Sequence, residues 1–376
     1  MNRIYNSLIK SIGALALTGL AACDYIHDDS LEPCEYRLRL VYDYNMKFAD
    51  AFGHEVTKAA LFICDNKGNF IRRQDIEGAE LKANDIAMDL KPGTYQVLTW
   101  AGLDDSSYQW PELTPGSSTI EEIRVKTLRE ADATQPNELT PLWHALDTLV
   151  VTGDRHEEKE ISLAKNTNKL RVVLQDTEGY SMDVRDFSFR IVADNGYMDY
   201  DNALLDDPAI TYLPYHTESV DIAAGADDDD DLINGKPANQ YVAVAELNTM
   251  RLMAGENYRL IVRHKDWEDD VLNVNLNQYL LLTQMEGHNI SAQEYLDRQD
   301  EYSIVFFLTP IVCPDCPDPD PDPEPDPEPD PDPDPDPEPD PDPDPEIPDP
   351  DVPVVGYACY KIQVKDWVIR LNNGEL

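Results

Sequence analysis

The six cysteines are the side chains of this 376-residue sequence with the widest choice of chemistry. Cys313 and Cys316 enclose a Pro-Asp dipeptide, which is the spacing of a redox motif or of half a zinc site. A zinc site would need a second pair of ligands, and Cys359 is the one candidate for a third ligand. We therefore expect Cys313, Cys316 and Cys359 to supply a disulfide or a free thiol, and we expect no metal.

The N-terminal segment puts another cysteine in a different context. The first ten residues carry two cations and no acid, and residues 12–22 are apolar or small, which is typical of a secretory signal too short to span a bilayer. Residues 20–23, Leu-Ala-Ala-Cys, resemble the lipobox of bacterial lipoproteins, in which the signal is cleaved before the cysteine and the new N-terminus is acylated. We expect residues 1–22 to be a signal peptide and Cys23 to be lipidated. The alternative is a plain secretory signal with an unrelated cysteine.

The residues that follow Cys23 indicate where the chain goes. Asp24, Asp28 and Asp29 form an acidic start that resembles the signal for surface export in lipoproteins of Bacteroides-type bacteria. Two or three acyl chains hold a protein firmly, because each buried CH₂ contributes about 0.8 kcal/mol. The expected location is the outer membrane, with the chain lipid-anchored, palmitate among its acyl groups, and exposed at the surface.

The net charge of the chain and the spacing of its Asp and His residues argue against several functions. Its 30 Lys and Arg face 74 Asp and Glu, a formal net charge of −44, and nucleic-acid binding depends on cations that neutralise phosphates. Five consecutive Asp at 227–231 lack the alternating ligands of a calcium loop, so they predict a solvated loop. The seven His are scattered and match no catalytic motif. We expect neither an enzyme nor a cofactor.

Period-two alternation dominates the elements that must carry these residues. Residues 36–42 place two tyrosines and two leucines on one face of a strand, and residues 60–64 form a more buried strand. Pro92-Gly93 predicts a tight turn, with Gly93 at positive φ, before a strand over 94–100. The first half of the chain is therefore predicted to be a β-sandwich.

A second set of strands follows a charged, turn-rich stretch at 154–158. One helix interrupts this set, because Ser291 and Glu294 form a capping-box pattern before apolar residues at helical spacing. We predict an all-β protein of two β-sandwiches in series, over residues 23–157 and 158–376. The strands of the second set are expected at 160–163, 169–175, 187–192, 241–247, 258–262, 271–276 and 303–308.

An acidic proline tract interrupts the second predicted domain. Residues 315–351 hold 18 acidic residues and no Lys or Arg, and proline at alternate positions forbids helix and sheet ladders. We expect residues 314–353 to form a disordered polyproline-type loop. The strongly β segment 360–371 after it is too short to stand alone in water, so it must pair with its own domain or with another molecule. Its alternation changes phase at Lys365-Asp366, which indicates either a bulge or a two-residue turn.

Taken together, these segments resemble the FimB-type fimbrial anchor and minor-subunit lipoprotein family of type V fimbriae. The resemblance rests on Cys23 and on four stretches in a fixed order: 34–45, 61–70, 90–102, and the ending 362–371 around Trp367. It implies two transthyretin-like Greek-key sandwiches and a role in assembly. Subunits of such fibres join by donor-strand complementation, in which a segment of one completes a sheet of its neighbour. The resemblance thus implies partners among the fimbrial stalk or accessory subunits.

For this chain the candidate closing or donated strand is Trp367, Val368, Ile369 and Leu371. A second hypothesis is a surface glycan-binding lipoprotein, which would also combine a lipid anchor with serial sandwiches. Trp100 lies in an apolar strand pattern and is expected in the core, as is Trp367. Trp110 and Trp143 lie within two residues of a proline and are the candidates for an exposed platform under that hypothesis.

Overall fold

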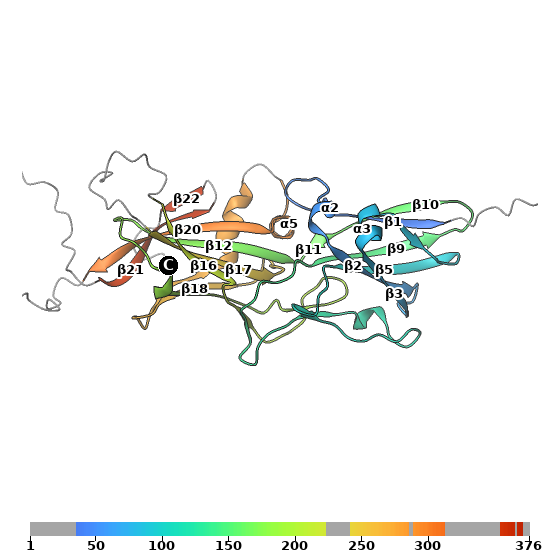
Figure 1. The fold of residues 1–376 in the computed structure, drawn as a ribbon, viewed down its shortest axis with the longest axis horizontal. Helices are drawn as coiled ribbons and strands as arrows, with labels where there is room; N and C mark the ends of the chain where they lie inside the picture. The colour runs from blue at the N-terminus through green and yellow to red at the C-terminus, as the bar shows by residue number, and fades with distance from the viewer. Residues whose placement is uncertain (1–34, 223–240, 286–288, 313–353, 365–366, 371–376) are drawn as a thin grey trace, which may run out of the picture.

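The computed structural model describes residues 35–222, 241–285, 289–312, 354–364 and 367–370. Strands form the bulk of this part of the chain, and the few helices are short. The molecule is elongated, with two β-sandwiches following one another along its long axis (Figure 1). The expected all-β class and serial sandwiches are confirmed.

The first sandwich packs a three-stranded sheet against a five-stranded sheet. The smaller sheet has the order β10-β1-β4 and the larger β11-β9-β5-β2-β3. Strand bounds are Glu157–Ser162 (β10), Tyr36–Val41 (β1), Ile86–Met88 (β4), Ala164–Lys165 (β11), Trp143–Val151 (β9), Gly93–Ala101 (β5), Lys58–Asp65 (β2) and Phe70–Glu77 (β3). Two short helices, α2 (Phe52–Glu55) and α3 (Gly78–Ala83), lie beside them.

Strand β1 has the predicted face pattern, since Tyr36, Leu38, Leu40 and Tyr42 are all buried. It pairs in parallel with β10 from Tyr36↔Glu157 to Val41↔Ser162, and antiparallel with β4. Strand β10 was expected at the start of the second set, but this pairing makes it part of the first sandwich. The sequence of β10 is charged and half-exposed, and it does not indicate which strand β10 pairs with. Alternation alone therefore could not assign β10 to the first sandwich.

The second sandwich is larger. Its two sheets have the orders β16-β17-β12-β20-β21-β22 and β19-β18-β13-β15-β8. The bounds are His216–Asp221 (β16), Tyr241–Met250 (β17), Thr167–Asp176 (β12), Glu301–Val312 (β20), Val354–Val364 (β21), Trp367–Arg370 (β22), Asp270–Asn275 (β19), Arg259–His264 (β18), Phe187–Ala193 (β13), Ile210–Tyr212 (β15) and Thr134–Gln135 (β8). Its helices are α4 (Leu276–Leu280) and α5 (Ala292–Arg298), with 3-10 turns η2 (Val184–Asp186) and η3 (Leu281–Met285).

The predicted helix is α5, where the Ser291 hydroxyl accepts from the backbone N–H of Glu294 at 3.1 Å. The Glu294 carboxylate turns instead to Arg298, at 2.8 Å from its Nε. The capping-box prediction was therefore correct for the Ser291 side chain but not for the Glu294 side chain.

A third, small sheet joins the two halves of the chain. Its order is β14-β7-β6, with bounds Tyr197–Met198, Val125–Thr127 and Tyr108–Gln109, and the 3-10 turn η1 (Ile120–Glu122) precedes β7. Strands β6 and β7 belong to the first half and β14 to the second. Strand β8, from the first half, likewise pairs with β15 of the second. The sandwiches are thus connected by shared sheets as well as by the chain itself.

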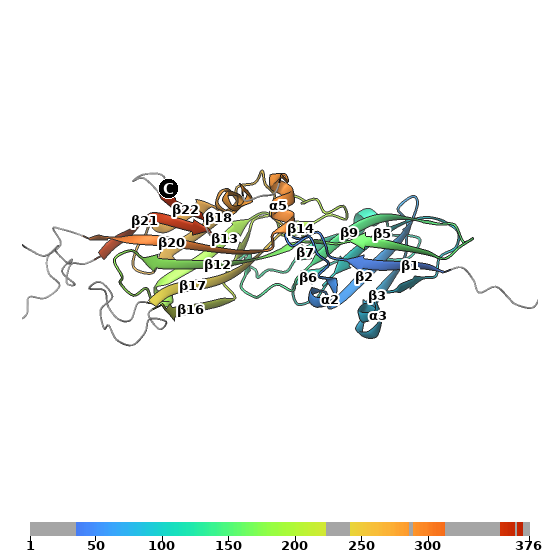
Figure 2. The same cartoon turned by 90° about the horizontal axis from the view of Figure 1, so that it is seen from above.

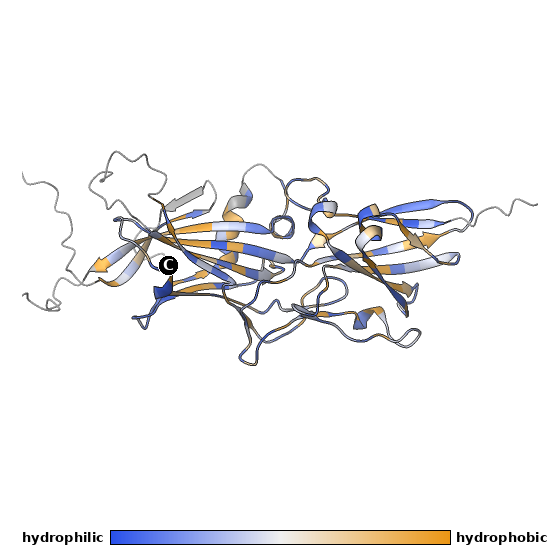
Figure 3. Ribbon diagram, in the orientation of Figure 1, coloured by the Kyte–Doolittle hydropathy of each residue, from blue (hydrophilic) through white to orange (hydrophobic). Residues whose placement is uncertain are grey.

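The hydrophobic core is continuous across this junction. One face of the β2–β5 pair packs against β1 and β10, through residues such as Leu61 and Val97. The other face, including Phe62 and Trp100, belongs to a cluster that extends through β12 to Phe306 of β20. Apolar stretches accordingly follow the central strands of both sandwiches in Figure 3. A core shared in this way makes the two sandwiches one packed body.

The turn before β5 differs from the expectation. Gly93 does not have positive φ; it is the first residue of β5 and pairs with Val151. The left-handed residue nearby is Gly153, at φ +74°, and a Cβ there would lie 2.6 Å from Cγ of Pro92. The proline therefore packs against the glycine of the neighbouring connection.

Gly102, just after β5, is the glycine whose replacement should disturb the fold most. It has φ +80°, and a Cβ on it would lie 1.9 Å from the backbone O of Pro141. We expect Gly102→Ala to lower the free energy of unfolding by about 2–4 kcal/mol, because left-handed strain and overpacking add. Urea denaturation measures this, with Gly116→Ala as control: Gly116 also has positive φ, but no atom lies within 4 Å of its Cβ position. Equal losses in the two variants would contradict the packing argument.

Candidate functional site

The start of β1 and the open end of the β20–β21 pair lie at opposite poles of the molecule. Strand β1 begins at one end of the long axis, and the β20–β21 pair ends at the other (Figures 1 and 2). Val312 and Val354 pair directly, so the chain leaves and re-enters the second sandwich at one place, on either side of the acidic proline tract. Cys23 lies outside the described residues, as do Cys313, Cys316, Leu371 and Asp227–Asp231 of the five-Asp run.

The closing segment pairs with its own domain. Strand β21 is antiparallel to β20, and β22 is antiparallel to β21, from Val364↔Trp367 to Lys361↔Arg370. Two residues separate the two strands, which is the spacing of a hairpin rather than of a bulge. Strand β22, with Trp367, Val368 and Ile369, is the last in its sheet, so among the described strands its outer edge faces no neighbour. Such an edge offers backbone N–H and C=O groups for further pairing.

Cys359 lies in β21 and is buried as a thiol. Its Sγ lies 3.8 Å from the backbone O of Lys361. Burial raises the pKa of this thiol to about 12, so it stays protonated near neutral pH and is a poor nucleophile. Cys64 of β2 has the same character, with a pKa raised to about 12 by burial. Neither described cysteine has the environment of a reactive thiol.

At the opposite pole, β1 is fully held by the first sandwich. Beyond its ladders with β10 and β4, the Asn84 side chain takes over the pairing of Leu40. Its Oδ1 accepts from Leu40 N–H at 2.9 Å, and its Nδ2 donates to Leu40 O at 2.7 Å. Asn84 itself ends α3 in the left-handed conformation, which asparagine tolerates. The strand nearest the expected anchor is therefore intramolecular and complete.

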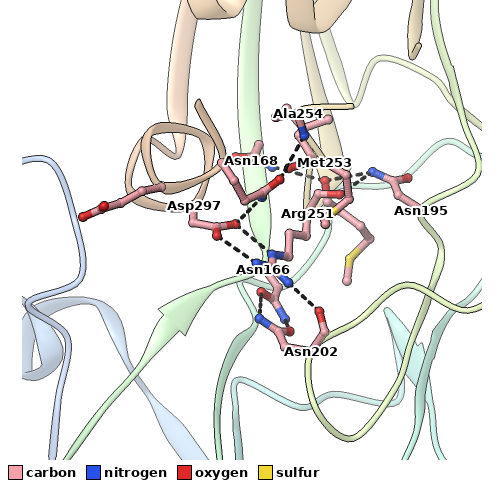
Figure 4. Close-up of polar contacts among 12 residues, drawn as sticks. Asn166, Asn168, Asn195, Asn202, Arg251, Met253, Ala254 and Asp297 are labelled. Carbon is pink, nitrogen blue, oxygen red and sulfur yellow. Dashed lines mark hydrogen bonds and ion pairs between the residues drawn. The ribbon is translucent and has the colours of Figure 1, made fainter. Parts of the chain in front are cut away.

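The junction between the sandwiches contains a polar network centred on Arg251. Its guanidinium forms two bonds to the Asp297 carboxylate of α5, at 2.7 and 2.8 Å, and donates to the backbone O of Asn202 (Figure 4). Both charged side chains are largely buried. Gln293 also donates to Asp297, and the Asn166 and Asn202 amides bond to each other. The network connects the end of β17, α5, the β11–β12 link and the β14–β15 loop.

Helix α5 also contacts the first sandwich. The Arg298 guanidinium lies over the rings of Tyr44 and Phe48, at 4.1 and 4.6 Å from their centroids, and Arg298 O accepts from Met46 N–H. Just beyond the helix, Asp300 pairs with Lys165.

Lys165 is a largely buried cation that bridges the two sandwiches. Besides Asp300 it bonds Glu55 at 3.0 Å, and it lies 5.4 Å from the centroid of Trp143. Burial alone would lower the pKa of Lys165, but Asp300 and Glu55 outweigh it and raise that pKa. The interaction keeps the amine charged and fixes α5 to the first sandwich.

His144 is buried at the same junction. Its ring packs edge-on to Trp100 at 4.7 Å, and Nε2 donates to the backbone O of Tyr200 at 2.8 Å. Burial lowers the pKa of His144 to about 4, and nearby Arg251 adds to the shift. The imidazole is therefore neutral in the folded protein at pH 7.

This histidine makes stability depend on pH. Below pH 6.5 the unfolded chain takes up a proton on His144 that the folded chain binds only near pH 4, so its contribution is complete above 6.5 and falls as pH drops toward 4. We expect a loss of up to about 1.4 kcal/mol per pH unit in this range. Urea denaturation of wild type and His144→Gln at several pH values measures the difference. The prediction fails if the difference between the two proteins is the same at pH 7 and pH 4.5.

The tryptophans divide differently from the expectation. Trp100 is buried, as predicted. Trp143 is buried as well, so its candidacy as an exposed platform was wrong. It starts β9, its ring meets the Tyr42 ring edge-on at 5.9 Å, and Lys165 Nζ lies 5.4 Å from its centroid. Pro141, two residues earlier, packs on Gly102. Trp110 is half-buried and borders a surface hollow.

Several solved structures have this fold. A candidate polysaccharide-binding protein of Bacteroides thetaiotaomicron is 30% identical, with a TM-score of 0.68 over 90% of this chain and 99% of the other. A candidate adhesin of the same species is 28% identical, with a TM-score of 0.68 over 91% and 100%. The fimbrial anchor protein Mfa2 of Porphyromonas gingivalis is 16% identical, with a TM-score of 0.59 over 90% and 99%, which shows a shared fold. The fold is thus that of all-β, adhesin-like surface proteins.

Residues 31–373 match the family of fimbrillin-A associated anchor proteins Mfa1 and Mfa2. The chain belongs to this family, which confirms the family resemblance of the sequence. It is a fimbria-associated surface protein, and the family is one of structural proteins rather than enzymes. No curated protein sequence matches the chain.

In the described residues, none of the helices has the length and apolar character needed to cross a membrane. In the same residues, no group of three or more His, Cys, Asp or Glu could hold a metal ion.

Proposed function

We propose that the chain is a lipid-anchored fimbrial base or minor subunit, held to the outer membrane through Cys23 and joined to the stalk by strand pairing at β22. The observation that carries this proposal is the polarity of the molecule. Strand β1, which follows the lipobox in the sequence, starts at one pole, and the β20–β21–β22 edge is near the other (Figure 1). A tether and a fibre joint at opposite poles would keep the partner away from the membrane.

The complete first sandwich supports the choice of β22. Strand β1 already lies between β10 and β4, and its own Leu38 and Leu40 side chains are fully buried in the core. An incoming strand could enter there only by displacing β1 and its core side chains. The outer edge of β22 can accept a strand without displacing anything among the described residues, and backbone pairing of this kind is a common mode of subunit assembly.

Deleting residues 367–376 tests the proposal. We expect loss of stalk attachment, because β22 and its edge disappear, while the sandwich stays folded, since the β20–β21 pair remains. Electron microscopy of cell-attached fibres and pull-down of stalk subunits by the purified chain measure attachment, and thermal unfolding and surface abundance report on the fold.

Deletion of residues 372–376, which leaves β22 in place, is the matched control and should retain attachment. Normal fibre attachment by the longer deletion at normal surface abundance would overturn the role of β22.

A further inference from the structure

The small sheet β14-β7-β6 has an outward face that the anchoring role does not use. Tyr197 on β14, Lys126 on β7 and Gln109 on β6 lie on one rung of the ladder, each directly opposite the next. Residues paired in register share a face of a sheet, and Arg124, two positions before Lys126, joins the same face. All four side chains are exposed or half-exposed.

The opposite face of this sheet is packed in the hydrophobic core. Tyr108, Val125 and Met198 alternate with the outward residues and are buried in the core shared by the two sandwiches. The outward side chains are thus positioned by three paired strands rather than by a free loop. Figure 2 places this sheet between the two sandwiches, and the β22 edge lies in the second of them.

A hollow of about 470 Å³ lies over this face. Trp110 and Glu122 line it together with Gln109, Arg124, Lys126 and Tyr197. The volume is in the range of small-molecule sites, and the lining combines two aromatic rings with an amide, a carboxylate and two cations. Gln109 offers both a donor and an acceptor, Glu122 accepts, and the two cations donate.

This set of groups fits a saccharide. A pyranose ring has an apolar face of C–H groups that can lie against the electron-rich face of an aromatic ring, and its hydroxyls both donate and accept hydrogen bonds. A peptide strand fits poorly, because the site is a sheet face whose backbone is already paired within the ladder. A sheet edge, rather than a face, is what strand addition requires.

The charges favour a neutral sugar over an acidic one. Lys126 Nζ lies 2.7 Å from the buried Asp207 carboxylate, and Arg124 Nε lies 3.1 Å from Asp199. The local cations are therefore already paired, and a chain of net charge −44 repels polyanions. We propose that the outer face of β14-β7-β6, with Trp110 and Tyr197 as stacking rings, binds neutral saccharide units.

An array of neutral gluco-, galacto-, manno- and xylo-oligosaccharides, with oligogalacturonate as the acidic counterpart, tests the proposal on the purified chain. The best neutral saccharide is then titrated by calorimetry. We expect Tyr197→Ala and Trp110→Ala to weaken binding at least about tenfold, because each removes a stacking ring, and Tyr197→Phe to keep it within about threefold. Tyr180→Ala is the matched control, since Tyr180 is an exposed tyrosine outside the hollow and should leave binding unchanged.

Thermal unfolding of each variant separates loss of the site from loss of the fold. Gln109→Ala provides a second route if Trp110→Ala fails to fold, because Gln109 is exposed and contributes a polar group rather than core volume. The proposal is overturned if no neutral saccharide binds, if oligogalacturonate binds more tightly than every neutral one, or if folded Tyr197→Ala and Gln109→Ala both bind as tightly as wild type.

Discussion

Replacing Cys23 with Ser should abolish both acylation and outer-membrane anchoring of the chain. The Cys23 sulfur is the atom to which the lipid is attached, and a serine hydroxyl at this position does not replace it in the lipobox. Each palmitoyl-length chain contributes on the order of 10 kcal/mol of membrane affinity, at about 0.8 kcal/mol per buried CH₂. We therefore expect no incorporation of labelled palmitate, an unprocessed precursor, and loss of cell-attached fibres.

The matched control is Cys34→Ser, which changes another cysteine close to the N-terminus and should keep label, processing and location. Labelled palmitate and fractionation of inner and outer membranes measure the outcome. A second arm replaces residues 1–23 by a cleavable secretory signal that lacks a lipobox, and should release the folded chain in soluble form. Label that persists in Cys23→Ser, or outer-membrane retention in the second arm, would contradict the anchor.

The second large effect is on stability, at the buried pair of Arg251 and Asp297. Removing one partner leaves a charge without its counter-ion in a largely buried place, which typically costs about 3–5 kcal/mol. We expect Arg251→Ala and Asp297→Ala each to lower the free energy of unfolding by this amount. In the double variant we expect a coupling energy of about 1.5–3 kcal/mol, because the second change removes the charge stranded by the first.

The comparison pair is Arg263 and Asp270, 3.0 Å apart but with the arginine much more exposed. The same cycle there should give a coupling energy below about 1 kcal/mol, since solvent screens exposed charges. Urea denaturation measures both cycles. Equal coupling energies at the two sites would show that burial does not govern the pair at the junction.

The sequence predicted the parts of the fold that repeat a local pattern. Alternation identified β1, β5 and the main strands of the second sandwich, and a capping serine identified α5, because burial of one face leaves a period that can be read along the chain. Strand β10 was misassigned because its partner, β1, lies far away in the sequence. Trp143 was misjudged because a proline two residues earlier does not determine which face of the strand the ring takes.

The sequence contains no local pattern that predicts the contacts at the junction between the sandwiches. Arg251 and Asp297 are far apart in the sequence and unremarkable in a chain with 74 acidic residues. The strands of the β14-β7-β6 sheet are two or three residues long, too short for a period of two to appear. The rung of Gln109, Lys126 and Tyr197 therefore becomes visible only when both halves of the chain are assembled.

The pairing of β1 has a mechanical consequence. This strand runs along the long axis (Figure 1), and its parallel ladder with β10 begins at the pole where the expected tether is attached. A fibre pulled away from the cell would load the rungs between β1 and β10 in shear, all at once, instead of peeling them apart one by one. The bonds that Asn84 makes to Leu40 would share the same load. The proposed anchor would thus resist tension most strongly in the direction in which flow pulls on a fimbria.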